Sequence, residues 1–178
     1  MIRIALFVFV VLTLSCTKDD QKVEIDEFLF FKSTVNTDNY RTNGYMYADN
    51  TGHNGPQIWI RKTQGDSIYV NVSVQEISPT NPPYQVGNID AYFYLVKKGS
   101  NFEGSYSLDK INYTGTYLLP ATATAMYIDT TAAFNFTVTD SSVHQPHGPY
   151  AEGSYNFTVI RNGVSQPASG SFRLKITP

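Results

Sequence analysis

The chain has 178 residues, of which 42% are hydrophobic and 16% are charged, and its formal net charge at pH 7 is −2. This length suits a single domain, the hydrophobic content excludes an intrinsically disordered chain, and the missing basic excess excludes a typical nucleic-acid-binding protein. The one cysteine, Cys16, excludes a disulfide framework within the chain. The high content of Tyr and Phe favours strands, since aromatic side chains suit a half-buried pleated surface.

Residues 1–15 have the parts of a secretory signal peptide. Arg3 supplies a positive charge, and residues 4–14 form an apolar run that only Thr13 interrupts. This run is too short to span a membrane, which needs ~20 residues, but it has the length of a signal-peptide core. A buried strand or a membrane helix is the alternative, and the abrupt change to polar residues at 17–20 argues against both.

The segment Leu12-Thr13-Leu14-Ser15-Cys16 resembles the lipobox of bacterial lipoproteins, in which a small residue precedes a Cys. Thr13 and Leu14 depart from the strict motif, as in the relaxed lipoboxes of one large group of Gram-negative bacteria. The resemblance implies that Cys16 is lipidated and becomes the first residue of the mature chain. Several acyl chains on one Cys anchor a protein stably, because each buried methylene contributes ~0.8 kcal/mol.

The residues Lys18, Asp19 and Asp20 resemble the Lys-acidic-acidic export tag of surface lipoproteins in the same group. The resemblance implies a lipid-anchored outer-membrane protein that is exposed on the cell surface. A solvated tether is the alternative, since charged residues are common after an anchor. The expected organisation is a signal peptide at 1–15, a lipidated Cys with a flexible tether at 16–24, and an all-β domain at 25–178.

Alternation of apolar and polar side chains predicts strands throughout this domain. The clearest example is 67–75, where Ile68, Val70 and Val72 share one face. The expected strands lie at 27–35, 44–48, 57–62, 67–75, 89–97, 113–119, 124–129, 134–139, 154–159 and 171–176. The expected turns lie at 49–52, 64–66, 98–101 and 161–163, and a proline-rich link lies at 79–83.

Two segments near the end of the chain make more specific predictions. Asn162-Gly163 separates two alternating runs and predicts a hairpin with a type I′ turn, which needs positive φ at both central residues. Residues 139–150 carry no alternation and are expected to form a long loop within a hairpin.

A short motif of Gly, hydroxyl, aromatic, any residue and apolar begins at Gly104, Gly115, Gly153 and Gly170. Its spacing is irregular, which excludes a solenoid or a propeller. We interpret each Gly as a bulge or a close backbone approach where a strand begins. At Gly153 we expect a strained or crowded position, including a positive φ.

About ten strands with short links predict a single antiparallel β-sandwich. The alternative is an up-and-down, lipocalin-like β-barrel, because the last strands look like a meander. No domain boundary interrupts the body of the chain. The body and the anchor together resemble the small all-β lipoproteins of Gram-negative bacteria that are rich in surface lipoproteins, and this resemblance implies no catalytic residues.

The aromatic residues suggest a binding face. Trp59 lies between Ile58 and Ile60, so its indole points away from the side that these two side chains occupy. Two buried Ile contribute about 1.5–3 kcal/mol each, which outweighs one Trp and favours burial of the Ile side. Tyr92 and Tyr94 share a face of another strand and join Trp59 if the strands are close. The alternative is that Tyr is simply common in strands.

The sequence offers few other sites. His144 and His147 are weak candidates for metal binding, because zinc needs three or four ligands and Pro146 between them excludes a helix. No cofactor is expected. A nucleophile elbow is missing, and nothing in the sequence brings two carboxylates together for glycoside hydrolysis.

The leading hypothesis is a surface-tethered binding or interaction module that is attached to the membrane through its lipid anchor. Its ligand is a glycan or a protein, and nucleic acid is excluded. The alternatives are a lipocalin-like carrier of an apolar ligand and a glycan-acting hydrolase.

The anchor makes the first testable prediction. Cys16→Ala should abolish incorporation of labelled palmitate and release the protein from the outer-membrane fraction, since the thiol is the acylation site. Fractionation of the wild type and the variant after labelling measures both effects. A wild type that takes up no label, or a variant that stays in the membrane, would contradict the lipoprotein hypothesis.

Overall fold

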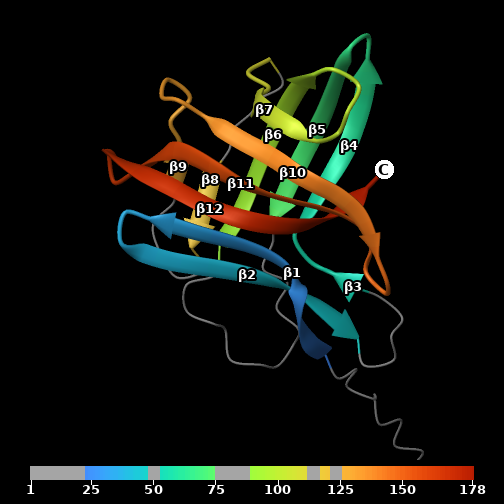
Figure 1. Cartoon of the computed structure of the whole chain (residues 1–178). Helices are drawn as coiled ribbons and strands as arrows, with labels where there is room; N and C mark the ends of the chain where they lie inside the picture. Colours follow the sequence, from blue (N-terminus) through green and yellow to red (C-terminus); the bar gives the residue numbers. More distant parts are fainter. Residues whose placement is uncertain (1–22, 48–52, 75–88, 112–116, 121–125) are drawn as a thin grey trace, which may run out of the picture.

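The structure is a computed structural model that describes residues 23–47, 53–74, 89–111, 117–120 and 126–178, with the backbone alone at 23–26, 45–47, 53–54 and 117–120. Within these residues it consists of strands joined by turns (Figure 1). The strands are β1 (Val23–Val35), β2 (Asp38–Tyr47), β3 (His53–Asn54), β4 (Gln57–Gln64), β5 (Ser67–Val74), β6 (Ile89–Lys98), β7 (Gly104–Leu108), β8 (Tyr117–Pro120), β9 (Met126–Ile128), β10 (Asn135–His144), β11 (Gly148–Arg161) and β12 (Val164–Thr177). No helix in this part of the chain is long and apolar enough to cross a membrane.

Seven strands close into a barrel in the order β12, β4, β5, β6, β7, β10 and β11, with β11 returning to β12. Strands β1, β2 and β3 extend from β12, and β8 and β9 link β6 to β11. All the pairs are antiparallel except β12 with β4, which run parallel. The all-β prediction is confirmed. The sandwich is not confirmed, and the barrel alternative fits, although the parallel pair departs from a strict up-and-down order.

The barrel closes because β12 has two neighbours along one edge. Its other edge pairs with β11 from Val164 to Lys175. On the shared edge, β1 pairs with Ala168 to Arg173, and β4 then pairs with Lys175 to Thr177. Backbone hydrogen bonds therefore join the β1–β2 layer to the β4–β5–β6 layer. In a sandwich, side-chain packing alone would join two such layers.

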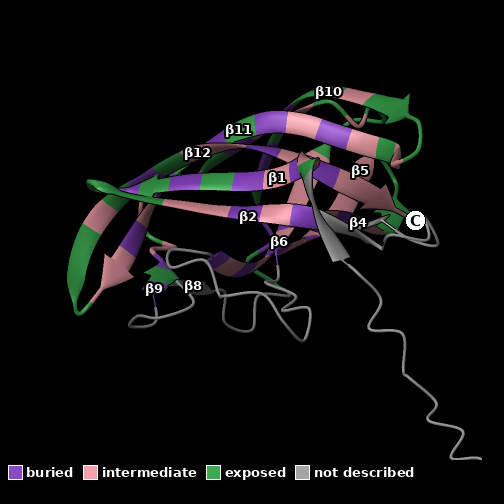
Figure 2. Cartoon of the chain, turned by 90° about the horizontal axis from the view of Figure 1, so that it is seen from below, coloured by how far each residue is buried: buried purple, intermediate pink, exposed green. Residues whose placement is uncertain are grey.

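Aromatic side chains fill the inside of the barrel. The Phe93 ring of β6 lies 6.3 Å from Phe31, 5.7 Å from Phe136 and 6.2 Å from Phe157, measured between ring centroids. Phe136 in turn stacks on Phe172 at 4.4 Å. The five rings come from β1, β6, β10, β11 and β12, and each is at most 1% exposed. Figure 2 shows buried and more exposed residues alternating along these strands, as period-two packing requires.

The strands predicted at 27–35, 57–62, 67–75 and 89–97 agree with β1, β4, β5 and β6 to within four residues. Those predicted at 44–48, 134–139, 154–159 and 171–176 overlap the longer strands β2, β10, β11 and β12, and β7 was not predicted. The hairpin at Asn162-Gly163 is confirmed, with φ of 52° and 76° at the two residues. The predicted loop at 139–150 is wrong, because β10 continues to His144 and β11 begins at Gly148. The hairpin extends beyond the core here, so its residues pair without the apolar alternation that marks the other strands. The signal peptide, most of the tether, the turn at 49–52 and the link at 79–83 lie outside the described residues.

Two of the repeated glycines, Gly153 and Gly170, mark places where two backbones meet, but both lie within strands and not where a strand begins. A Cβ on Gly153 would lie 1.9 Å from the carbonyl oxygen of Thr137, and one on Gly170 would lie 1.9 Å from that of Lys32. The pairing shifts by one residue beside Gly153, which indicates a bulge at Thr139. The expected positive φ at Gly153 is wrong; among the three motif glycines that the structure describes, the positive value, 122°, occurs at Gly104. A side chain at Gly153 is therefore excluded by its collision with Thr137 and not by a positive φ.

Substitution of Gly153 tests this explanation. Gly153→Val should lower the free energy of unfolding by more than ~1 kcal/mol. Gly153→Ala should cost a similar amount, because the first side-chain carbon already collides with Thr137. Ser154→Val, on the exposed neighbour, is the control and should leave the urea midpoint nearly unchanged. A midpoint for Gly153→Ala equal to that of the control would show that the glycine is not needed for close approach.

Candidate functional site

The three predicted aromatic residues lie on the outer face of β4, β5 and β6. Trp59 pairs with Asn71 of β5, and Asn71 pairs with Tyr94 of β6. Residues that are paired directly share a face, so the side chains of Trp59, Asn71 and Tyr94 form one row across the sheet. Tyr92 belongs to the next row, opposite Ser73. We call this surface the β4–β5–β6 face.

The Trp59 side chain is the most exposed large aromatic of these strands. It is 40% exposed, whereas its neighbour Ile58 is fully buried in the core. Ile60 is partly buried and also packs against the core. The orientation that the two isoleucines predicted for the indole therefore agrees with the structure.

A β-bulge places two cations on this face. Ile60 pairs with Val70 and Lys62 pairs with Tyr69, so Arg61 is an extra residue without a partner in the ladder. The guanidinium carbon of Arg61 lies 4.6 Å from the centroid of the Tyr94 ring. The Nζ of Lys62 lies 4.8 Å from that of the Tyr69 ring. Strict alternation would have sent one of the two side chains inward, and the bulge keeps both outside.

An ion pair with Asp109 holds Arg61 in place. Its Nη2 lies 2.6 Å from the Oδ2 of Asp109, whose side chain is 3% exposed. The backbone N–H of Asp109 donates to the carbonyl of Tyr94, so the carboxylate is fixed to β6. The pair balances the charge of Arg61. Within the described residues Lys62 forms no ion pair, and neither does Lys98, which lies on the same face at the end of β6, so both charges are uncompensated there.

The carboxamide of Asn71 lies between Trp59 and Tyr94. Its Oδ1 is buried and has no hydrogen-bond partner within the described part of the chain. An unpaired buried acceptor costs about 1–3 kcal/mol, and such groups deserve a functional explanation. The β4–β5–β6 face therefore combines an exposed indole, two cations and an unsatisfied amide oxygen.

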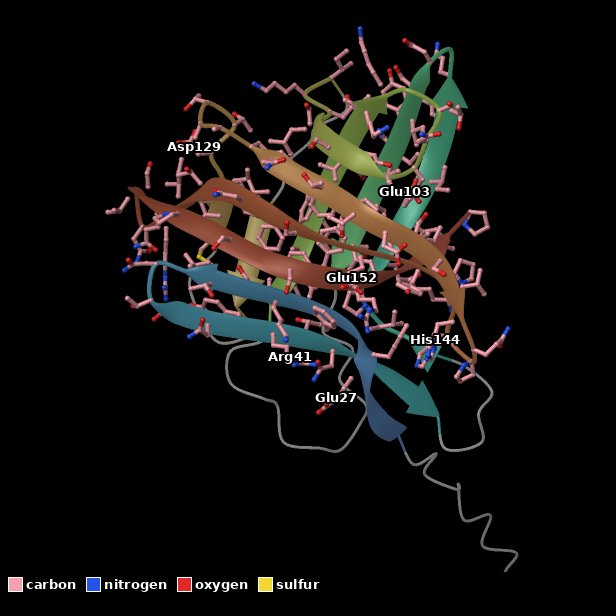
Figure 3. The ribbon with its side chains drawn as sticks, in the orientation of Figure 1. Glu27, Arg41, Glu103, Asp129, His144 and Glu152 are labelled. Carbon is pink, nitrogen blue, oxygen red and sulfur yellow. The ribbon has the colours of Figure 1, made fainter. Side chains whose placement is uncertain are left out.

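The two histidine candidates lie together at the tip of the β10–β11 hairpin, where Figure 3 labels His144. Their Nδ1 atoms are 3.0 Å apart, and both rings stack on Phe28 with centroids 4.1 and 4.3 Å away. No group of three or more His, Cys, Asp and Glu that suits a metal occurs in the described residues. The two imidazoles form a hydrogen bond with each other, and their stacking on Phe28 attaches the hairpin to β1.

Arg173 completes this cluster from β12. Its guanidinium carbon lies 4.6 Å from the Phe28 ring and 5.6 Å from the Tyr150 ring, and its Nε donates to Glu152 at 2.8 Å. Because these residues come from four strands, no local sequence pattern could have predicted the cluster. Arg61, Lys62, Tyr69 and Asn71 were missed for another reason. The alternation in the sequence predicted which side of β5 faces solvent, but no sequence pattern predicted the bulge in β4.

The other sites considered from sequence show no shared geometry in the described residues. Glu152 is paired with Arg173, and Glu103 accepts a hydrogen bond from Ser141. This hydrogen bond lowers the pKa of the Glu103 carboxyl. Cys16, Lys18, Asp19 and Asp20 lie outside the described residues.

Asp109 is buried, so the two substitutions that break its ion pair with Arg61 should lower the free energy of unfolding by unequal amounts. Arg61→Met should lower the free energy of unfolding by about 2 kcal/mol or more, since it leaves a buried carboxylate without its cation. Asp109→Asn should cost less, because the amide oxygen still accepts from Ile111 N–H and Arg61 reaches water. Urea titrations of both variants measure the difference. Equal costs, or a larger cost for Asp109→Asn, would contradict the geometry described above.

Comparison with known proteins supplies no relative. No family model, no curated protein and no solved structure matches this chain.

Proposed function

We propose that this chain is a surface-tethered lipoprotein whose β4–β5–β6 face binds a glycan. The anchor is the lipidated Cys16, with Lys18, Asp19 and Asp20 as the signal for export to the cell surface. The folded domain then presents its ligand-binding face outside the outer membrane. No catalytic step is part of this proposal.

The exposed indole of Trp59 is the observation that carries the proposal. It is 40% exposed although it sits in a strand whose other side is buried in the core. A large aromatic ring with polar neighbours suits a ligand that has one apolar face and polar edges. A pyranose ring has this character, since its C–H groups lie on its faces and its hydroxyls lie around its rim. Asn71 and Arg61 are placed beside the indole to meet those hydroxyls.

The two alternative functions have less support. A lipocalin-like carrier needs a cavity of ~300 Å³ or more for its ligand. The described interior of this barrel is instead occupied by the rings of Phe31, Phe93, Phe136, Phe157 and Phe172. A glycan hydrolase needs two facing carboxylates. Glu103 and Glu152 have separate partners, and cations occupy the aromatic face.

A protein ligand remains the second candidate for the same face. Aromatic side chains and Arg are enriched where proteins bind each other. However, the described residues of the face combine one exposed indole and three half-buried tyrosines with polar and cationic side chains. This composition favours a sugar ring over the apolar edge of a protein.

Fluorescence of the single tryptophan tests the proposed function. The full chain should show emission typical of a partly exposed indole, quenching by iodide, and a spectral shift when a matching surface polysaccharide is added. Trp59→Ala should lose binding to that polysaccharide on a glycan array. Tyr127→Ala removes another exposed aromatic ring, 54% exposed on β9, and should keep binding. Unquenchable blue emission, or array binding that Trp59→Ala does not change, would overturn the proposal.

A further inference from the structure

We infer that the β4–β5–β6 face selects an acidic sugar, with its ring stacked on Trp59 and its carboxylate paired with Lys62. This inference rests on the proposed glycan binding and adds the chemical class of the ligand. A neutral sugar would satisfy the indole and would leave the charge of Lys62 unused.

The charges of the face point to an anionic ligand. Two cations lie over its tyrosine rings, Arg61 above Tyr94 and Lys62 above Tyr69. The buried carboxylate of Asp109 neutralises Arg61 at 2.6 Å. Lys62 has no such carboxylate among the described residues, and its ammonium is exposed. A charge-assisted hydrogen bond from an ammonium to a carboxylate is about twice as strong as a neutral one.

The bulge at Arg61 is the second argument. If β4 continued without it, Lys62 would follow the outward Arg61 on the inner side of the sheet. The bulge instead sets Lys62 opposite Tyr69, on the same face as Trp59. Bulges are common beside binding sites, where they re-aim a side chain. Here the bulge adds a cation to the aromatic face without breaking the Arg61–Asp109 pair.

The positions of the groups also match one sugar unit. Trp59 pairs with Asn71, and Lys62 pairs with Tyr69, two residues away on β5. Two residues along a strand span ~7 Å, which the flexible stem of Lys62 bridges to a carboxylate on a ring above Trp59. Asn71 lies between them on β5, and its buried Oδ1 has no hydrogen-bond partner among the described residues.

The experiment compares tetragalacturonate with its methyl ester, which keeps the rings and removes the charge. Both are titrated into the full chain at low salt, with Trp59 fluorescence and calorimetry as readouts. The acid form should bind about tenfold more tightly, and added salt should weaken this preference. Lys62→Met should remove the preference, so that the acid and the ester bind with equal affinity. Lys32→Met, an exposed lysine on β1 outside this face, is the matched charge control and should keep the preference.

Each result separates the inference from the proposed function. Equal binding of acid and ester, or a preference that survives in Lys62→Met, overturns the acidic-sugar inference and leaves glycan binding intact. Failure of both ligands, together with no array binding that depends on Trp59, overturns both. Unchanged urea midpoints for the two lysine variants show that the effects arise at the surface and not from unfolding.

Discussion

Strand β12 imposes the constraint on which the rest of the structure depends. It has two neighbours on a single edge, β1 and then β4, while β11 runs along its other edge. This arrangement closes the barrel and fixes how close β1 approaches. Gly170 makes the approach feasible, because any side chain there would collide with the carbonyl of Lys32. Gly170 therefore permits β1 to pair with β12 beside the point where β4 closes the barrel.

Two buried hydroxyl groups then fix the extra strands on the barrel. The Tyr155 hydroxyl of β11 donates to the carbonyl of Lys32 in β1 at 2.9 Å. Burial raises the pKa of Tyr155, so the phenol remains a donor at any physiological pH. The Thr42 hydroxyl of β2 donates to the carbonyl of Ile89 and accepts its N–H, which ties β2 to the start of β6. Each bond satisfies a polar group that would be costly to bury alone.

The sequence predicted what depends on neighbours along the chain. The alternation in β5 and the Asn162-Gly163 turn are local, and both agree with the structure. Closure of the barrel depends on the parallel pairing of β12 with β4, between residues more than a hundred positions apart, and no local pattern contains it. For the same reason, the orientation of Trp59 was predictable from Ile58, whereas its grouping with Asn71 and Lys62 was not. Lys62 follows from a bulge, which shifts the alternation that the prediction relied on.

The same closure also explains why the β4–β5–β6 face suits a ligand. The last pair between β12 and β4 joins Thr177 to Trp59, so the backbone beneath the exposed indole is held on both sides. A rigid platform loses little conformational entropy when a ligand is bound, and it therefore keeps more of the interaction energy as affinity. The aromatic rings on the outer side of β1, β12 and β11 are instead covered by other side chains. Arg173 lies over the rings of Phe28, Phe30 and Tyr150, and His144 stacks on Phe28. Trp59 therefore lies where the pairing of β12 with β4 closes the barrel, and this pairing supports the surface that is proposed to bind the glycan.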